Sequence, residues 1–254
     1  KLVGEAVSAG AYEVRLAAQD TGVYGDDIGS SLPALLRLVS SVDGDFRIRV
    51  GMLNPLPPAQ IDDLVSSYAS RKVYKFAHMP LQSGSDRVLA SMGRKYSCGD
   101  FAASVAAFRS RFPEITIATD VIVGYPGESE ADFQLTLDAI LKTRPAKIHV
   151  ARFSPRPHTI AASMAQVPDS VKKRRSQELV KLKMRVQRSN NELWLGKTVS
   201  AFVFGSIGGR RMAARMDNYK PVLIEPCSPA ILGRRVDVQV DSCTPFSLGG
   251  SIIR

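Results

Sequence analysis

The chain has 254 residues, of which 44% are hydrophobic and 23% are charged, and its formal net charge is +10. This composition indicates a soluble globular protein of one large or two smaller domains, and no apolar run is long enough to cross a membrane. No export signal is visible, and the three cysteines are too few and too scattered for a disulfide framework. We therefore expect a cytoplasmic protein.

The first two thirds of the chain alternate between short β-branched segments and helical patterns. Strands are expected over residues 13–17, 47–51, 73–77, 115–123 and 148–153, and helices over residues 32–42, 59–70, 99–112 and 130–142. The strands are apolar on both faces, which is typical of a parallel sheet covered by helices. The pattern predicts an α/β fold with a complete or partial (β/α) barrel.

Polar residues follow each expected strand at its carboxyl end. They are Gln19 and Asp20, Asn54, His78 and Gln82, the stretch from Gly124 to Glu128, and Ser154 and Arg156. Because the carboxyl ends of parallel strands meet at one edge of a sheet, we expect these residues to form one shared catalytic site.

The excess of positive charge lies in the last third of the chain. Up to residue 167, 18 Lys and Arg residues stand against 17 Asp and Glu residues, whereas from residue 168 onward 16 stand against 7. A basic helix is expected over residues 170–195, with Leu179, Leu182, Val186 and Leu193 on its apolar face. Its cations, which include Lys172, Arg174 and Arg175, form either a solvated surface or an RNA-binding face.

The chain ends in short segments separated by glycines. Strands are expected over residues 198–204, 210–214, 219–225, 234–240 and 251–253, which is the size of a small closed β barrel. Its polar and basic loop residues are Arg210, Arg211, Arg215, Asn218, Tyr219 and Lys220. The cations are suited to RNA phosphates, and the tyrosine ring is suited to stacking on a base.

Six stretches together carry a family resemblance. They are residues 16–22 (LAAQDTG), 47–55 (RIRVGMLNP), 78–86 (HMPLQSGSD), 92–96 (MGRKY), 119–128 (TDVIVGYPGE) and 152–157 (RFSPRP). The sequence resembles the methylthiotransferases of the radical S-adenosylmethionine superfamily, followed by the small RNA-binding TRAM domain with which those enzymes end. The second and third stretches are most similar to the archaeal and eukaryotic branch, which converts N6-threonylcarbamoyladenosine beside the tRNA anticodon into its 2-methylthio derivative.

The resemblance implies three parts. Residues 1–167 would form strands two to six of a partial radical S-adenosylmethionine barrel, residues 168–195 a basic connecting helix, and residues 196–254 an OB-like, all-β TRAM barrel. It also implies S-adenosylmethionine and [4Fe-4S] clusters as cofactors, tRNA as the partner, an electron donor and a source of sulfur, no membrane, and a monomeric enzyme.

The cysteine loop that holds the radical S-adenosylmethionine cluster in this family does not occur in the sequence. Cys98, Cys227 and Cys243 cannot replace it, because the thiolate ligands of one cluster must converge within a few ångströms. We therefore expect the polypeptide as given to be catalytically inactive, and part of a longer enzyme.

The resemblance and the residue types suggest roles at the expected site. Cofactor contacts are expected from Gln19, Gln82, Ser83 and Asp120, with Gly124 allowing close backbone approach, while His78 and Asp20 are the expected catalytic residues. Substrate contacts are expected from Arg152 and Arg156, which would hold the threonylcarbamoyl carboxylate, and from Tyr24, which would stack near the substrate.

Structural alternatives stay open at this point. Asp120 would otherwise cap a helix or form a buried ion pair, and either arginine would form a structural salt bridge, with Asp20 as one partner. Two other functions also remain. One is a methylthiotransferase for isopentenyladenosine in tRNA or for an aspartate of a ribosomal protein, and the other is a cluster-free RNA-binding scaffold.

Overall fold

The computed structural model describes residues 1–226 and 228–253, and the first part of this chain is a parallel α/β structure. Its strands are β1 (Glu13–Leu16), β2 (Arg47–Val50), β3 (Phe76–His78), β4 (Thr116–Val123) and β5 (Lys147–Arg152). β1 pairs with β2, and β4 pairs with both β3 and β5, in each case parallel. Isolated parallel bridges from Ile48 to Val73 and from Met52 to His78 connect the two groups. All five expected strands therefore occur, although the third begins at Phe76, three residues later than expected, because Val73 forms only an isolated bridge.

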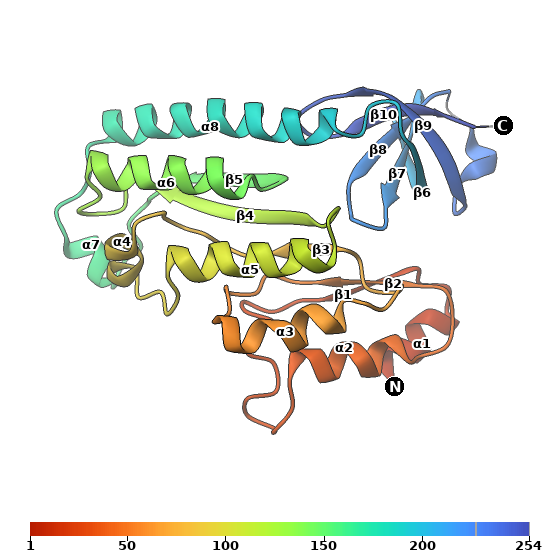
Figure 1. The fold of residues 1–254 in the computed structure, drawn as a ribbon, viewed down its shortest axis with the longest axis horizontal. Helices are drawn as coiled ribbons and strands as arrows, with labels where there is room; N and C mark the ends of the chain where they lie inside the picture. Colours follow the sequence, from red (N-terminus) through yellow and green to blue (C-terminus); the bar gives the residue numbers. More distant parts are fainter. Residues whose placement is uncertain (227, 254) are drawn as a thin grey trace.

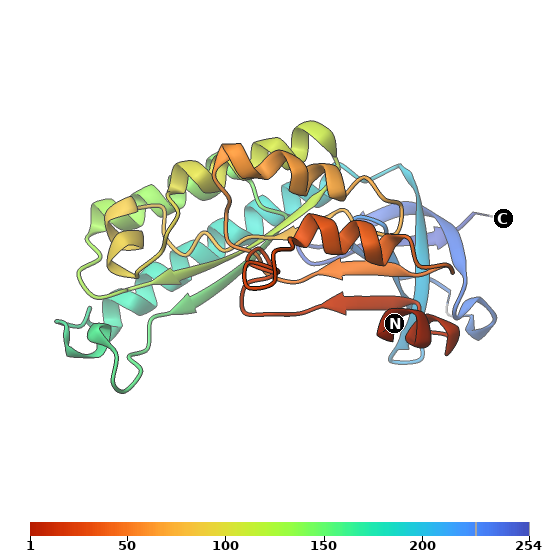
Figure 2. The same cartoon turned by 90° about the horizontal axis from the view of Figure 1, so that it is seen from below.

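Most of the helices gather on one face of these strands in Figure 2, whereas the short red helix beside the amino terminus and the short green helix at the lower left lie outside that layer. The helices are α1 (Leu2–Ser8), α2 (Leu32–Ser40), α3 (Pro58–Ser67), α4 (Asp86–Ser91), α5 (Cys98–Arg111), α6 (Glu130–Thr143) and α7 (Ile160–Ser163). Ser97 and Ser129 begin α5 and α6 with capping boxes, in which Asp100 and Asp132 bond back to the chain. One apolar core joins the helices to the covered strand face. The opposite face of the strands is not covered by this core, and it carries polar side chains such as those of His78 and Asp120.

A long helix connects this part to a second one (Figure 1). It is α8 (Asp169–Glu192), and it buries Leu179, Leu182 and Val186 as expected. Leu193 was wrongly placed on this apolar face, because it lies at the helix end and is 68% exposed. The next residue, Trp194, is buried instead, and it packs into the core of the following barrel.

The last part is a closed five-stranded barrel, as the strand pattern predicted. Its strands are β6 (Thr198–Ile207), β7 (Arg211–Met216), β8 (Pro221–Ile224), β9 (Arg235–Cys243) and β10 (Leu248–Ile252), and a short 3-10 helix, η1 (Pro229–Ile231), precedes β9. They close in the order β10, β8, β7, β6, β9. Among the described residues of this part, twelve buried side chains form a core of their own.

The barrel docks against the amino ends of the parallel strands, at the right of Figure 1. The amide of Lys75 donates to the carbonyl of Asp217 over 2.8 Å, and the side chain of Asn218 donates to the carbonyl of Glu114 over 3.0 Å. Tyr12 stacks on Phe202. The two parts therefore share a specific interface at the end of the sheet opposite the expected catalytic edge.

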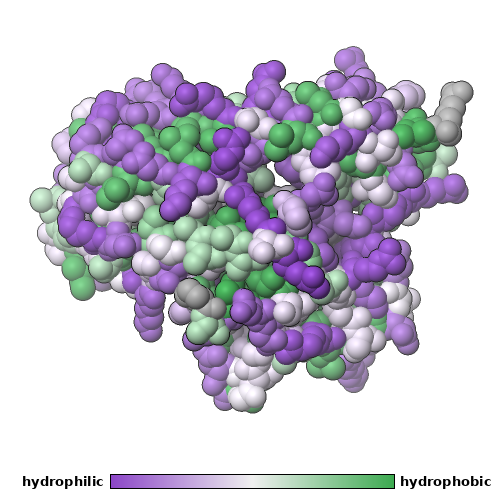
Figure 3. Space-filling model, in the orientation of Figure 1, coloured by the Kyte–Doolittle hydropathy of each residue, from purple (hydrophilic) through white to green (hydrophobic). Residues whose placement is uncertain are grey.

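The surface in Figure 3 is mainly hydrophilic, with hydrophobic side chains between the polar ones. Within the described residues, no helix combines the length and the apolar character needed to cross a membrane.

Candidate functional site

His78 and Asp120 meet at the bare face of the sheet. His78 ends β3 and Asp120 lies in β4, and His78 Nε2 is 2.8 Å from Asp120 Oδ2. Burial opposes the charge on Asp120, but the hydrogen bond and the charge of His78 outweigh it and lower the pKa of this carboxyl. His149, opposite Asp120 in β5, has its ring centroid 6.0 Å from that of His78. The pair can hold a proton beside a ligand on this face.

Asp20 joins the loops that follow β1 and β2. Its Oδ1 accepts hydrogen bonds from the amides of Gly22 and Asn54, and its Oδ2 accepts one from Asn54 Nδ2 over 2.6 Å. Both carboxylate oxygens are therefore engaged in holding the loops. The alternative ion pair between Asp20 and Arg152 or Arg156 does not occur among the ion pairs of the described residues, and the carboxylate positions its neighbours.

Tyr96 also belongs to this edge, although no role was predicted for it. It is 7% exposed, and burial raises the pKa of its hydroxyl to about 12, with Arg94 opposing the shift and the charges of Asp120 and Asp20 adding to it. Tyr96 therefore lies within electrostatic range of Arg94 and of both carboxylates. The stretch MGRKY contributed to the family resemblance, but it follows a short helix and no strand, so the strand pattern assigned it no role.

Among the buried polar atoms that have no hydrogen-bond partner within the described part of the chain, three lie in the segments that follow β2, β3 and α4. They are Asn54 Oδ1, Gln82 Oε1 and the hydroxyl oxygen of Tyr96. An unpaired buried polar group costs about 1–3 kcal/mol, so groups of this kind are usually satisfied by a ligand or water. The edge therefore fits a polar ligand such as S-adenosylmethionine.

Gln82 is held in an unusual conformation. Its φ is 60°, its amide donates to the carbonyl of Asp120, and its carbonyl accepts from the amide of Ile122. These bonds fix the backbone beside the His78–Asp120 pair and leave the carboxamide at the edge.

Ser83 and Gly124 have structural roles that differ from the expected cofactor contacts. Ser83 is fully buried, and its hydroxyl lies 3.5 Å from that of Thr136 in α6. Gly124 has a φ of 74°, and a Cβ there would lie 2.4 Å from Cγ of Lys172. Packing against α6 and α8 therefore accounts for these two residues.

Four expected site residues lie at the exposed surface. Gln19 and Tyr24 follow β1, Arg152 ends β5, and Arg156 lies in the next loop. Their proposed contacts with cofactor and substrate stay predictions.

The expected RNA-binding residues of α8 separate into buried and exposed groups. Lys172 and Arg175 are 6% and 4% exposed. The guanidinium of Arg175 bonds to Glu128 over 2.7 Å and to Glu130 over 3.1 Å, whereas Arg174 meets Glu130 at the surface. Burial gives Lys172 and Arg175 a structural role, which corrects their expected contact with RNA.

The barrel residues separate in the same way. Arg210 is exposed, and Arg211 pairs with Glu225 at the surface. The other four lie in the interface: Arg215 pairs with Glu13, Asn218 bonds to Glu114, Tyr219 packs on Tyr74 and Phe76, and Lys220 bonds to Asn191. The ring of Tyr219 is therefore engaged by protein, which corrects its expected stacking on a base.

The described cysteines do not converge. Cys98 begins α5 and Cys243 ends β9, both are free, and Cys227 lies outside the described residues. Within residues 1–226 and 228–253, no group of three or more His, Cys, Asp or Glu side chains is arranged to hold a metal ion. The described side chains thus supply no ligand set for a [4Fe-4S] cluster.

Comparisons with known proteins agree with both parts of the fold. The family model of the Radical SAM superfamily matches residues 1–140, and that of the TRAM domain matches residues 206–253. A solved radical S-adenosylmethionine methyltransferase, TsrM from Kitasatospora setae, superposes with a TM-score of 0.51 at 16% identity, over 63% of this chain and 29% of that chain. This likeness supports the fold alone.

Relatives with higher identity have names that concern tRNA. A probable threonylcarbamoyladenosine tRNA methylthiotransferase of Pyrococcus horikoshii is 42% identical over 86% of this chain and 52% of its own length. The threonylcarbamoyladenosine tRNA methylthiotransferase of Danio rerio is 38% identical over 98% and 45%. A tRNA-2-methylthio-N(6)-dimethylallyladenosine synthase of Acetivibrio thermocellus is 37% identical over 95% and 51%.

The chain thus spans about half the length of these relatives. Since the first family model covers more than half of the sequence, the chain belongs to the Radical SAM superfamily.

Proposed function

We propose that this chain is part of a tRNA methylthiotransferase that converts N6-threonylcarbamoyladenosine into 2-methylthio-N6-threonylcarbamoyladenosine. The observation that carries the proposal is the similarity of nearly the whole chain to relatives of that name in both archaea and animals. The polar edge around His78 and Asp120 supports it, because it lies where parallel strands bring functional groups together.

Our proposal assigns the ligand contacts to the unpaired groups. The Gln82 carboxamide, the Tyr96 hydroxyl and the side-chain oxygen Oδ1 of Asn54 would hold S-adenosylmethionine. Bound with a [4Fe-4S] cluster, that cofactor supplies the hydrogen-abstracting chemistry of the superfamily. His78, oriented by Asp120, would hold a proton beside the substrate, and Arg152 and Arg156 would bind its carboxylate.

The rest of the proposal rests on the family resemblance. The reaction requires an electron donor and a source of sulfur, and we place the enzyme in the cytoplasm as a monomer. We keep the division into residues 1–167, 168–195 and 196–254 as barrel, connecting helix and RNA-binding domain.

The test uses the full-length protein that contains this chain, reconstituted anaerobically with iron, sulfide and S-adenosylmethionine. It is incubated with tRNA bearing either threonylcarbamoyladenosine or isopentenyladenosine, and the nucleosides are measured by mass spectrometry. A methylthio product from the first tRNA supports the proposal. Product from the second alone identifies the sister activity, and RNA binding without either product identifies a scaffold.

A substitution sharpens this test. Arg156→Ala is expected to lower methylthiolation more than it lowers cofactor cleavage without tRNA, because its partner is present only on the substrate. Arg71→Ala removes an exposed arginine before β3 and serves as the control. Equal loss of both activities in Arg156→Ala would indicate a structural role.

A further inference from the structure

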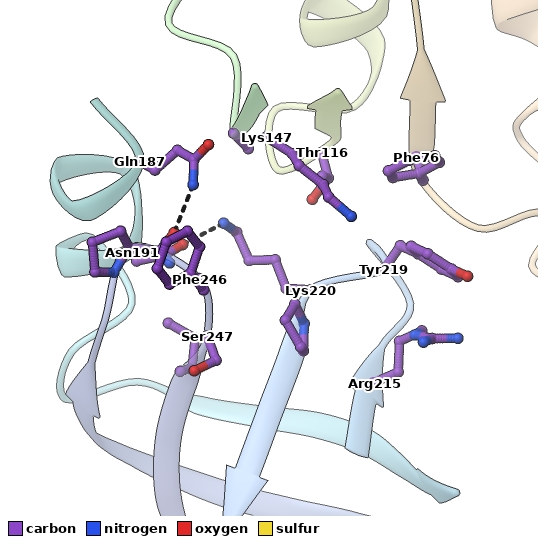
Figure 4. Close-up of a pocket in the computed structure, with 14 residues that line it drawn as sticks. Phe76, Thr116, Lys147, Gln187, Asn191, Arg215, Tyr219, Lys220, Phe246 and Ser247 are labelled. Atoms are coloured by element: carbon purple, nitrogen blue, oxygen red, sulfur yellow. Dashed lines mark hydrogen bonds between the residues drawn. The ribbon is translucent and has the colours of Figure 1, made fainter. Parts of the chain in front are cut away.

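A cavity of about 370 Å³ lies where the barrel meets the amino ends of β3, β4 and β5. Its lining includes Thr116 and Lys147 from the sheet, Asn191 from α8, and Lys220 and Phe246 from the barrel (Figure 4). In Figure 4 the Lys147 and Lys220 side chains reach into it from the sheet side and the barrel side. This junction pocket is separate from the His78–Asp120 edge, and it has the size of an ordinary small-ligand site.

Positive charge gathers in and beside the pocket. Lys220 is 8% exposed, and its Nζ donates to Asn191 Oδ1 over 2.6 Å. The Lys183 ammonium lies 6.0 Å from the centroid of the Phe246 ring. In the described parts of the chain, none of Lys147, Lys183 and Lys220 forms an ion pair with a carboxylate. Arg215 also lines the pocket, and its guanidinium already pairs with the carboxylate of Glu13.

The electrostatics agree with this accumulation of cations. Burial lowers the pKa of Lys220 to about 8. Burial also lowers the pKa of Lys147, with Arg49 and Arg215 adding to the shift and Asp120 opposing it, and burial and Lys147 lower that of Lys183. An anion placed among these groups would relieve the repulsion between Lys147 and Lys183 and offset the burial of Lys220.

A second observation points to a ligand independently of charge. Thr116 is 5% exposed, and its Oγ1 has no hydrogen-bond partner in the described structure. This hydroxyl lines the pocket, so it is available to donate to an anionic oxygen. Phe246 is 59% exposed, in contrast to Tyr219, which packs on Tyr74 and Phe76. An exposed aromatic ring beside cations is the arrangement that binds a nucleotide of single-stranded RNA.

The pocket also leads toward the candidate active edge. Lys147 and His149 are two positions apart in β5, so they share the bare face of the sheet. At roughly 3.3 Å per residue, they are about 7 Å apart along the strand. His149 in turn lies opposite Asp120. A polymer anchored at Lys147 would therefore continue along this face to His78.

We propose that the junction pocket binds a backbone phosphate of the substrate tRNA through Thr116, Lys147, Lys183 and Lys220, with an adjoining base stacked on Phe246. This inference rests on the proposed function, since it takes the RNA to be the modified tRNA. It assigns to the domain junction a contact close to the reacting nucleotide, and it moves the aromatic contact from Tyr219 to Phe246.

The test measures tRNA affinity of the full-length protein at several salt concentrations. Lys147→Ala combined with Lys183→Ala is expected to weaken binding and to reduce the log–log salt slope by about 0.7–0.9 if one phosphate contact is lost. Lys142→Ala combined with Arg71→Ala removes the same charge from exposed positions on α6 and before β3, and the slope should not change. A parental slope in the first variant would overturn the proposal.

Two further variants separate stacking and hydrogen bonding from charge. Phe246→Ala should weaken binding about 5- to 150-fold with an unchanged slope. Thr116→Val preserves the shape of the side chain and removes an unpaired hydroxyl, so it should weaken binding without loss of unfolding free energy. Full affinity in both variants would contradict the proposed contacts even if the lysine variant had misfolded.

Competition with inorganic phosphate tests whether the pocket binds a phosphate of RNA or only a free phosphate ion. At constant ionic strength it should compete weakly with tRNA, and phosphate binding with no effect on RNA affinity would overturn the proposal. The nucleoside assay keeps the two hypotheses apart. A parental slope with methylthio product rejects the pocket alone, whereas lysine-dependent binding without product rejects the proposed reaction alone.

Discussion

The two ends of the parallel strands differ in how their buried polar groups are satisfied. At the carboxyl ends, buried atoms of Asn54, Gln82 and Tyr96 have no partner among the described residues. At the amino ends, Gln187 and Asn218 bond to backbone atoms across the domain junction. Thr116 Oγ1 also has no partner among the described residues, and Thr116 lines the junction pocket. The hydroxyls of Ser40 and Tyr68, at the ends of α2 and α3, are likewise unpaired in the described structure.

The difference separates a face built for ligands from a face built for docking. A satisfied buried hydrogen bond adds about 0.5–1.5 kcal/mol to stability, whereas an unsatisfied group costs about 1–3 kcal/mol. Substitutions at the docking end should therefore lower the unfolding free energy, while substitutions at the ligand end should lower binding with little effect on stability. Four predictions test this contrast.

The largest expected effect is at Gln187, which is 2% exposed. Its Oε1 accepts from the amide of Ile148 over 2.9 Å, and its Nε2 donates to the carbonyl of Pro245 over 3.0 Å. Gln187→Ala leaves two backbone groups without these partners and should cost about 2–4 kcal/mol in urea unfolding. Gln134→Ala, at an exposed glutamine of α6 that bonds to Asp138, should change stability by less than about 0.5 kcal/mol. Equal losses of unfolding free energy in the two variants would contradict the stabilising role of the docking end.

Tyr219 should give the next effect. Its ring packs on Tyr74 and Phe76, and the Arg215 guanidinium lies 4.1 Å from its centroid. Tyr219→Ala should cost about 2–3 kcal/mol through lost packing. Tyr219→Phe retains the ring and loses a 3.4 Å contact with Glu13, so it should cost less than about 0.5 kcal/mol. A stable Tyr219→Ala protein with weakened RNA affinity would restore the stacking role expected from the sequence.

A smaller, pH-dependent effect is expected at Asp217. Burial opposes its charge, but Arg235 and Arg47 outweigh burial and lower the pKa of this carboxyl in the folded protein. Its contribution is therefore present above the unfolded pKa, near pH 4, and is lost as the pH falls through the folded pKa. Because the side chain is 54% exposed, Asp217→Asn should cost at most about 1 kcal/mol at pH 7.

The measurement compares unfolding free energies at several pH values. The difference between the parent and Asp217→Asn should shrink between about pH 5 and pH 2, as the parent carboxylate becomes protonated. A constant difference across this range would assign the effect to packing.

The sequence predicted the strands and their polar ends, because short-range patterns determine them. Ser129 and Asp132, for instance, form a capping box that places α6 directly after the β4 turn. The pattern on α8 was less informative, because exposed and buried arginines look alike in sequence. Arg175 is buried by Glu128 and Glu130, which precede it by 47 and 45 residues.

The same limit applies at the barrel and at the site. An aromatic residue among cations suits either RNA or another domain, and tertiary packing gave Tyr219 the second role. Tyr96 reaches the site from a loop after α4, so the strand pattern did not indicate it. Contacts between residues far apart in the sequence, rather than local propensity, determined the roles of these residues.

The smallest stability effect and the most selective functional one are expected at Gln82. This residue is 7% exposed, and its Oε1 has no partner in the described structure. Gln82→Met keeps a similar unbranched shape and removes the unpaired oxygen, so the unfolding free energy should stay equal or rise by up to about 1 kcal/mol. In the full-length, cluster-loaded protein, the same change should weaken S-adenosylmethionine binding about tenfold or more, equivalent to about 1.4 kcal/mol. Gln60→Met, at an exposed position of α3, should alter neither quantity. If Gln82→Met destabilised the protein and left cofactor affinity intact, the carboxyl ends of the strands would be a structural edge like the amino ends, and the assignment of Gln82 to the cofactor would be wrong.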